Sequence, residues 1–332
     1  MTSAAPKPET IDRLASAVYT SFAMLSGMQL DLFTPLKDGH LTAAQLAQAL
    51  GVRADKLQPL LYALVAAGLL TVDGERFANT PEADHFLVRG KPTYIGGRHE
   101  TFSRQWTGVL KTAETIRTGS PQAKIDFSAM PKDQLESIYR GLHVAATASG
   151  RDLVARYDFS ACHSLMDVAG GSGGIAIAVT EAFPHLRATV VDLPTVTPIT
   201  QRYVAEASAA HRVQVMTADV VNGPLTGSFD VAVMRSFIQV LSSDQARRAI
   251  RNVSQVIQPG GAVYILGSVL DNSRLSPLEI AAQNLNYLNI YDEGEAYTEQ
   301  EYQDWLTEAG FVDFKRVVLP NKTSIVTARK PK

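Results

Sequence analysis

The sequence has a single cysteine, Cys162, among its 332 residues. No disulfide can form within the chain, which favours a reducing compartment, and we interpret this thiol as a structural residue and not as a nucleophile. No apolar run approaches the roughly 18 residues that a membrane-spanning helix needs, and the first residues do not resemble a secretion signal. We therefore expect a cytoplasmic protein that does not associate with membranes.

A strong charge of either sign is also absent. The 31 basic and 33 acidic residues give a formal net charge of −2 at pH 7. Without a basic excess, the chain has no electrostatic basis for binding nucleic acid. We expect neither a nucleic-acid partner nor a bound metal ion.

The first segment with a clear pattern is helical. Between Ile11 and Phe33 apolar residues recur at the spacing of one helix face. Such a stripe must be buried, either within its own domain or against a second subunit. We predict a homodimer whose interface includes this helix.

A second helical stretch is followed by a hairpin. The sequence from Thr42 to Gln45 has the form of a capping box, and Gly51 is suited to end the helix that follows. After another apolar helix, Asp73-Gly74 predicts a tight hairpin turn. This order is typical of a winged helix, but the helix that would read DNA carries few basic residues. We interpret residues 1–100 as a dimerisation domain.

The pattern changes near Leu165, where short apolar runs begin to alternate with helical segments. This alternation predicts βαβ units and a mainly parallel, doubly wound α/β sheet. We assign residues 101–332 to this second domain, with residues 101–155 as helices that cover its pocket. The expected internal strands are Ser164–Val168, Ala188–Val191, Val213–Thr217, Phe229–Met234 and Gly261–Gly267.

A glycine-rich loop follows the first of these strands. It runs from Asp167 through Gly170, Gly171 and Gly173, and a helix is predicted directly after it. Glycines let the backbone approach a ligand closely, and the helix start offers free N–H donors. Proteins that bind NAD, FAD or S-adenosylmethionine all use such a loop.

Three aspartates sharpen this prediction, because each lies at the end of one of three successive strands. Asp167 would be unfavourable beside a pyrophosphate and favourable beside the sulfonium and ammonium groups of S-adenosylmethionine. Asp192 has the spacing that binds ribose hydroxyls, and Asp219 is placed to accept a hydrogen bond from the adenine amino group. S-adenosylmethionine is therefore the expected cofactor.

At this point the sequence resembles the dimeric small-molecule methyltransferases called O-methyltransferase family 2, which include plant caffeate and flavonoid enzymes and bacterial antibiotic enzymes. The resemblance covers nearly the whole chain and implies a Rossmann-like class I methyltransferase sheet. Besides the domain order and the glycine loop, the matching motifs are Val191–Val196, Ala218–Val220, Gln258–Gly261 and Tyr297–Tyr302.

The resemblance also implies roles for individual residues. The three loop glycines would line the methionine portion of the cofactor. Asp192 and Leu193 would hold the ribose, and Asp219 and Val220 the adenine. Arg235 stands where the family has a lysine or arginine that contacts the cofactor.

The catalytic pattern of the family is missing. Gln239 stands in place of the family's general-base histidine, Val240 in place of the adjacent aspartate, and Ala296 in place of the glutamate that orients the histidine. A glutamine cannot accept a proton near neutral pH, although it can orient an acceptor. We expect an acceptor atom that needs no base. Candidates are a thioether sulfur, as in a methylthio-hydroxy acid on a route to dimethylsulfoniopropionate, or a carbon or nitrogen atom.

Other interpretations stay open. His143, on the helix before the sheet, is a candidate substitute base, which would return an oxygen acceptor. The chain could also bind the cofactor without transferring a methyl group, or act as a winged-helix regulator.

Several further side chains are candidates for binding the acceptor or closing over the sulfonium. Arg104 and Arg140 could clamp a carboxylate, and Trp106 and Tyr139 could make cation–π contacts. By the resemblance, the helix from Leu278 to Tyr291 walls the acceptor pocket, and its amides and phenols suggest a polar acceptor. The candidates on this helix are Asn286, Tyr287 and Tyr291.

Overall fold

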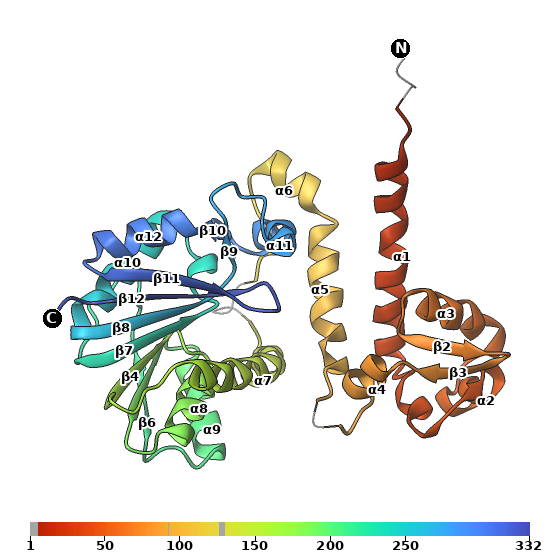
Figure 1. The fold of residues 1–332 in the computed structure, drawn as a ribbon, viewed down its shortest axis with the longest axis horizontal. Coiled ribbons are helices and arrows are strands. Elements are labelled where there is room, and N and C mark those ends of the chain that lie inside the picture. The colour runs from red at the N-terminus through yellow and green to blue at the C-terminus, as the bar shows by residue number, and fades with distance from the viewer. Residues whose placement is uncertain (1–5, 92, 126–129) are drawn as a thin grey trace. The chain divides into compact units, whose positions relative to one another are not determined.

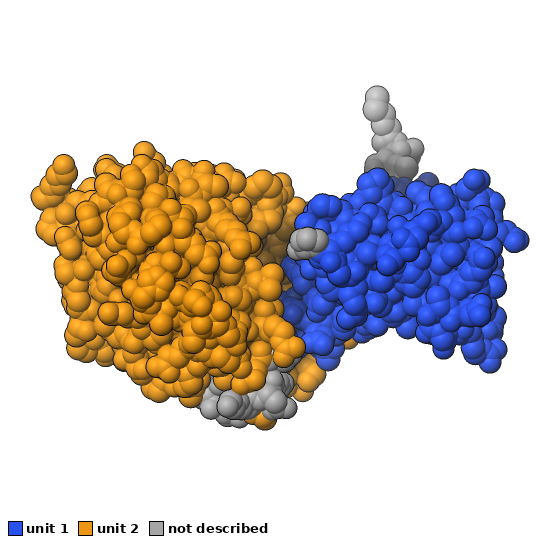
Figure 2. Space-filling model, turned by 90° about the horizontal axis from the view of Figure 1, so that it is seen from below, with its two compact units in different colours: residues 1–107 blue, residues 108–332 orange. Residues whose placement is uncertain are grey.

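The computed structural model describes residues 6–91, 93–125 and 130–332. The chain forms two compact units, the first ending at Thr107 and the second beginning at Gly108, and Figure 2 colours them separately. Among the described residues no helix combines the length and the apolar character needed to cross a membrane.

The first unit is a set of helices around a small antiparallel sheet with the strand order β1-β3-β2 (Figure 1). Its strands are β1 (Leu41–Thr42), β2 (Leu70–Asp73) and β3 (Arg76–Asn79). Its helical elements are α1 (Glu9–Gln29), η1 (Thr34–Asp38), α2 (Ala43–Leu50), α3 (Ala54–Ala66), α4 (Pro81–Leu87), η2 (Gly96–Arg98) and α5 (His99–Val109), of which α5 continues past Thr107.

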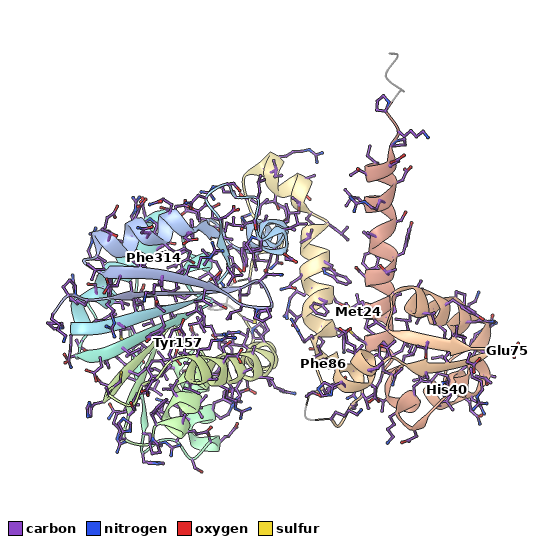
Figure 3. The ribbon with its side chains drawn as sticks, in the orientation of Figure 1. Met24, His40, Glu75, Phe86, Tyr157 and Phe314 are labelled. Atoms are coloured by element: carbon purple, nitrogen blue, oxygen red, sulfur yellow. The ribbon has the colours of Figure 1, made fainter. Side chains whose placement is uncertain are left out.

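The predicted local signals form as expected in this unit. The Thr42 hydroxyl accepts a hydrogen bond from the Gln45 N–H at 3.3 Å, and the Gln45 side chain accepts one from the Thr42 N–H at 2.9 Å. Gly51 ends α2 in the left-handed conformation, with φ of 69°. Met24 of α1 packs against the core of the unit and is labelled in Figure 3. The earlier turns of α1 leave apolar side chains exposed, including Ile11, Leu14 and Tyr19.

The second unit is built on a seven-stranded sheet with the order β11-β12-β8-β7-β4-β5-β6, in which β12 runs antiparallel to both neighbours. The other pairs in this sheet are parallel, so the prediction of a mainly parallel α/β sheet is confirmed. The strands are β4 (Ser164–Val168), β5 (Arg187–Asp192), β6 (Val213–Thr217), β7 (Phe229–Arg235), β8 (Ile257–Gly267), β11 (Val312–Val318) and β12 (Ser324–Arg329). A separate two-stranded pair joins β9 (Val269–Leu270) and β10 (Tyr297–Thr298).

Helices cover both faces of this sheet (Figure 1). Successive residues of β4 point to opposite faces, so Leu165 packs with one set of helices and Met166 with the other. One face is covered by α7 (Lys132–Arg156), α8 (Gly174–Ala182) and α9 (Thr197–Glu206), and the other by α10 (Ser243–Val256) and α12 (Glu299–Glu308). The remaining helical elements of this unit are α6 (Thr112–Thr118), η3 (Ile238–Val240) and α11 (Leu278–Ile290).

The order of the strands fixes where a site can form. Strand β4 lies between β5 and β7, and all three are parallel, so their carboxyl ends share one edge of the sheet. In such sheets ligands bind at the carboxyl edge where the chain direction of the crossovers reverses.

A boundary that differs from expectation is the start of β8. This strand begins at Ile257 and not at Gly261, and its pairing to β7 is irregular. Tyr157, which is labelled in Figure 3, directly follows α7. Its ring packs edge-on against Tyr264 of β8, with 4.9 Å between ring centroids.

Candidate active site

The glycine-rich loop connects β4 to α8, and its backbone is tightly confined. A Cβ atom on Gly170 would lie 2.7 Å from the Asp167 Cγ and 2.7 Å from the Val190 Cγ1, so no other residue fits there without movement. Gly171 and Gly173 have φ of 58° and 73°, a region that favours glycine. The loop is therefore shaped by its glycines and by the side chains packed behind it.

Asp192 ends β5 and holds this loop from the neighbouring strand. One carboxylate oxygen accepts a hydrogen bond from the Gly171 N–H at 2.8 Å, and the other accepts one from the Leu193 N–H at 2.8 Å. Burial raises the pKa of Asp192, and these two hydrogen bonds oppose that shift. Leu193 is 45% exposed, so an apolar surface lies next to the carboxylate.

Asp167 lies behind the loop and is 1% exposed. Its carboxylate accepts a hydrogen bond from the Ala176 N–H at 3.1 Å. Burial raises the pKa of Asp167 to about 7, helped by the charge of Asp192 and opposed by the Ala176 N–H and by Arg235. Arg235, at the end of β7, donates to the Ser149 hydroxyl of α7 at 2.8 Å, and burial lowers its own pKa.

Asp219 follows β6, beyond its last residue Thr217. Its carboxylate accepts hydrogen bonds from the backbone N–H groups of Val221 and Asn222 and from the Asn222 side chain. Partial burial works against it, but these hydrogen bonds lower the pKa of Asp219. Val220 is buried in the sheet core. The three aspartates thus lie at or just beyond the carboxyl ends of three adjacent strands.

Helix α7 brings two predicted residues to the glycine loop. The Tyr139 ring would lie 3.1 Å from a Cβ atom on Gly171, and burial raises the Tyr139 pKa. The Nδ1 atom of His143 lies 2.9 Å from the Ser172 hydroxyl, and its ring stacks on Tyr203 with 4.1 Å between centroids. Burial lowers the pKa of His143, and the charge of Glu206 opposes this shift.

Gln239 lies in η3, after β7, and is 5% exposed. The Tyr287 phenol oxygen lies 2.9 Å from the Ser268 hydroxyl. Burial raises the pKa of Tyr287, and Ser268 and the Gln239 side chain oppose that shift. A Cβ atom on Gly294 would lie 2.5 Å from the backbone carbonyl oxygen of Gln239, so the segment before Ala296 packs tightly against Gln239. These residues come from four separate segments of the chain.

Helix α11 contributes its polar residues unequally. Tyr287 and Tyr291 lie together, with 6.1 Å between ring centroids, and burial raises the Tyr291 pKa to about 12. The carbonyl oxygen of the Asn286 side chain is buried and has no hydrogen-bond partner among the described residues. That the amides of this helix indicate a polar acceptor stays a prediction, and one of these amides is used within the fold. The Asn289 amide bonds to Thr112 and Thr115 of α6 and to the Leu285 carbonyl, so it holds the fold together.

Three other predicted residues have surroundings of a different kind. Arg104 and Arg140 are exposed. Trp106 stacks on Phe102 and packs edge-on against Phe22, so its ring contributes to aromatic packing in the first unit.

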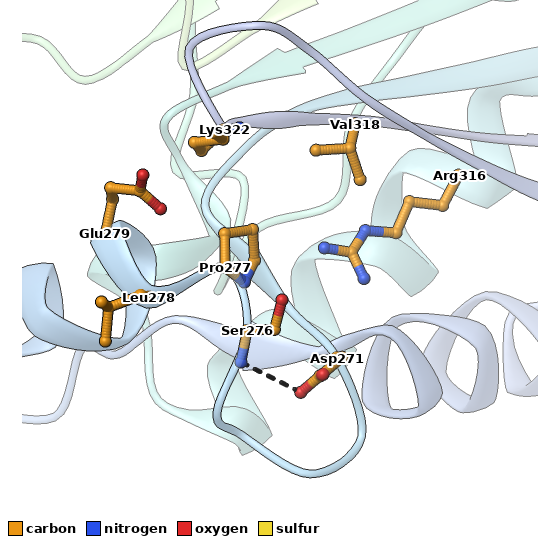
Figure 4. Close-up of a pocket in the computed structure, with 8 residues that line it drawn as sticks. All are labelled: Asp271, Ser276, Pro277, Leu278, Glu279, Arg316, Val318 and Lys322. Atoms are coloured by element: carbon orange, nitrogen blue, oxygen red, sulfur yellow. Dashed lines mark hydrogen bonds between the residues drawn. The ribbon is translucent and has the colours of Figure 1, made fainter.

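A surface cavity of about 440 Å³ lies elsewhere in the second unit and contains none of the predicted residues (Figure 4). The Arg316 guanidinium on its wall is held by the carbonyl groups of Val269 and Leu270, by Ser324 and by Glu299. Arg316 therefore holds the surrounding strands together, and we assign no ligand to this cavity. Its lining residues are Asp271, Ser276, Pro277, Leu278, Glu279, Arg316, Val318 and Lys322.

Comparison with known proteins agrees with this arrangement. The family model described as an O-methyltransferase domain matches residues 119–312, and the O-methyltransferase dimerisation domain matches residues 12–89. The chain belongs to the O-methyltransferase family. It is therefore an S-adenosylmethionine-dependent methyltransferase with a class I catalytic sheet.

Individual members of the O-methyltransferase family match nearly the whole chain. A 3-hydroxy-5-methyl-1-naphthoate 3-O-methyltransferase of Streptomyces sahachiroi is 30% identical, over 97% of this chain and 95% of the relative. An N,N-dimethyltransferase of Streptomyces rimosus is 28% identical, over 90% of this chain and 89% of the relative. The structure of human N-acetylserotonin methyltransferase in complex with S-adenosylmethionine has the same fold, with a TM-score of 0.80, 21% identity and full coverage of both chains.

The residues at the carboxyl edge of the sheet fit the cofactor of this family. The space beside Gly170 leaves no room for a side chain. The Asp192 carboxylate lies next to the exposed apolar side chain of Leu193. A sulfonium nucleoside presents cationic, hydroxyl and apolar groups that match these features. Sequence reasoning did not foresee the contact between His143 and Ser172 or the tight approach of Gly294 to Gln239.

Proposed function

We propose that this methyltransferase acts on a small polar acceptor at an atom that needs no general base. The observation that carries the proposal is the buried group formed by Gln239, Tyr287 and Ser268 at the position where related enzymes have a histidine base. Each of these side chains can donate or accept a hydrogen bond, but none takes up a proton readily near neutral pH.

The surroundings of the two phenols support this proposal. Burial raises the pKa of Tyr287 and of Tyr291, so both stay protonated. Among the residues that the structure describes, the other groups that act on their pKa values are Ser268, Gln239 and Tyr287 itself, and none of these is a carboxylate or an imidazole. Catalysis at such a site rests on holding the acceptor in line with the methyl group and on excluding water.

For the cofactor we propose the roles that the resemblance implied. Asp192 and Leu193 would hold the ribose, Asp219 and Val220 the adenine, and the loop glycines the methionine portion. Asp167 would lie toward the positive charge of the methionyl group. Arg235 would act from the end of β7, where it is already fixed to α7 through Ser149.

The acceptor atom we propose is a nitrogen, sulfur or carbon atom that carries a free electron pair. The N,N-dimethyltransferase among the relatives supports nitrogen, because an amine can attack the methyl group in its neutral form. The unpartnered carbonyl oxygen of Asn286 supports an acceptor that carries a hydrogen-bond donor, since a buried acceptor without a partner is costly.

The experiment is transfer of a labelled methyl group from S-adenosylmethionine to a panel of amines, thioethers, enols and phenols. For the best acceptor, the pH dependence of turnover at saturating ligands should show no ionisation near pH 6.5, which is about the pKa of histidine. Gln239→Ala should cost an orienting hydrogen bond, about 1–2 kcal/mol in the barrier, or roughly fivefold to thirtyfold in rate. The exposed Gln258→Ala is the matched control. A steep loss of activity below pH 6.5 would contradict the proposal.

A second candidate is methylation of an oxygen atom with His143 as the base. The lowered pKa of His143 favours it, because a neutral imidazole can accept a proton, and so does the naphthoate 3-O-methyltransferase among the relatives. Under this alternative His143→Ala should lower turnover by about 10²–10⁴-fold while ligand binding stays intact. Unchanged turnover in that variant would exclude it.

We also propose that the enzyme works as a homodimer joined through α1. The dimerisation domain covers most of this helix, and Ile11, Leu14 and Tyr19 are 70%, 57% and 72% exposed in the single chain. Burying these side chains against a second copy would remove a large apolar surface from water. Light scattering should give twice the chain mass of 35.9 kDa, and Leu14→Asp should shift the protein toward the monomer. A monomer at micromolar concentration would contradict this proposal.

A further inference from the structure

The glycine loop is held by contacts from two directions. On the sheet side, Asp192 accepts from the Gly171 N–H, and the Thr200 hydroxyl of α9 donates to the Gly171 carbonyl. From α7, the contact is the hydrogen bond between His143 Nδ1 and the Ser172 hydroxyl. Ser172 is 2% exposed, so this hydroxyl depends on His143 for a partner.

His143 is itself fixed from behind. Its ring stacks on Tyr203 of α9 with an interplanar angle of 16°, and the Arg202 guanidinium lies 5.2 Å from the centroid of the Tyr203 ring. Arg202 also forms an ion pair at 3.0 Å with Glu136, seven residues before His143 on α7. The imidazole is therefore locked between α7 and α9, and its orientation toward Ser172 is set by packing.

The partners of His143 do not resemble those of a general base. A base histidine normally has a carboxylate on its second nitrogen, which orients the ring and stabilises the imidazolium. Here the hydrogen-bond partner is the uncharged Ser172 hydroxyl. Within the described part of the chain, Glu206 is the carboxylate that acts on the ring, and its effect on the pKa is smaller than that of burial.

We infer that His143 is a positioning residue: through Ser172 it holds the glycine loop against α7 in the conformation that binds S-adenosylmethionine. The inference rests on the cofactor and not on the identity of the acceptor, so it can be tested without a methyl acceptor. It assigns His143 to affinity for the cofactor, whereas the base hypothesis assigns it to proton transfer.

The test is calorimetric titration of S-adenosylhomocysteine into the full-length protein and three variants. His143→Phe keeps an aromatic ring for the stack but removes the hydrogen bond, and Ser172→Ala removes it from the other side. Each should raise Kd about threefold to tenfold. The double variant should raise Kd no further than one single variant, since both remove the same contact. His143→Asn can still bond to Ser172 and should recover at least half of the loss in binding free energy.

The exposed His185 provides a matched control, because it does not contact the loop. His185→Asn should leave Kd within about twofold of the wild type. Unchanged Kd in both His143→Phe and Ser172→Ala would overturn the inference, and so would additive effects in the double variant. If His143→Phe fails to fold, Ser172→Ala and His143→Asn still decide the matter. Failure of the acceptor proposal would leave these binding results unaffected.

Discussion

The second unit contains two regions that lie at the ends of its strands and are built differently. The first is the glycine loop with Asp167 and Asp192, where each carboxylate is bound by backbone N–H groups. The second is the group around Gln239, where side chains bond to side chains from distant segments. Backbone groups are the same in any sequence, so a site made from them changes little when side chains are substituted. A site made from side chains can change with each substitution, and this is where the sequence is predicted to depart from the pattern of its family.

The largest effect is expected when a carboxylate is removed from the first region. Asp192→Ala would leave the Gly171 and Leu193 N–H groups without their acceptor and would remove the proposed ribose contact. We expect a loss of about 1.5–3 kcal/mol in binding of S-adenosylmethionine, roughly tenfold to a hundredfold in Kd, measured by calorimetry. Asp158→Ala, which removes an exposed carboxylate that bonds only to Ser160, is the control. Equal affinity in the two variants would argue against the ribose assignment.

In the second region a single methyl group should have a smaller effect. Gly294→Ala would place a Cβ atom 2.5 Å from the Gln239 carbonyl oxygen and 3.0 Å from the Tyr291 ring. The backbone must shift, which should lower the free energy of unfolding by about 1–3 kcal/mol in denaturant titration. Affinity for the cofactor should stay within about twofold, because the glycine loop is not involved.

Gly141→Ala is the control for that variant. A Cβ atom there meets no atom within 4 Å, and the residue lies inside α7. Alanine stabilises a helix interior relative to glycine, so this variant should gain up to about 1 kcal/mol. If Gly294→Ala also stabilises the protein, the tight closure over Gln239 does not exist in solution.

The smallest expected effect is the pH dependence caused by Asp167. Its pKa is raised in the folded protein to about 7 from an unfolded value near 3.8, so the folded state binds more protons between these values. The stability that this proton contributes is present below pH 3.8 and is lost as the pH rises to about 7. Asp167→Asn should therefore gain stability relative to the wild type as the pH rises.

The net gain in that variant should be about 1 kcal/mol at pH 8, because the new amide brings two buried N–H donors that offset part of the benefit. Thermal unfolding at pH 5 and pH 8 measures the difference. If the stability of the variant relative to the wild type does not rise between pH 5 and pH 8, the pKa of Asp167 is not raised in the folded protein. Glu181→Gln, an exposed carboxylate on α8, is the control.

Much of the first region was predictable because its signals are local. The strand Ser164–Val168 was predicted with its observed bounds, since an apolar run there is followed directly by the glycines. The three aspartates each lie at or just beyond the end of a parallel strand, and parallel strands bring their ends to one edge. The family resemblance added roles for these residues, and those roles stay predictions.

The rest depended on contacts between distant segments, which a sequence does not display. His143 and Ser172 are 29 residues apart, and Asn289 meets Thr115 across 174 residues. The amides of α11 therefore looked alike in the sequence, although Asn289 bonds to α6 and Asn286 keeps a carbonyl oxygen without a partner. In the first unit, Trp106 packs against two aromatic rings, and no sequence pattern predicted these pairs.

On α11, one set of residues attaches the helix to the fold and another lies next to Gln239. This separation has a consequence for how such enzymes acquire new acceptors. Asn289 fixes one side of the helix to α6 with every hydrogen-bonding atom of its amide in use. Tyr287 and Tyr291 carry the side chains next to Gln239, and their replacement does not touch that attachment. We therefore expect that the residues around the proposed acceptor site can be exchanged one at a time while the helix keeps its place. A change of substrate then requires few substitutions and no change of fold.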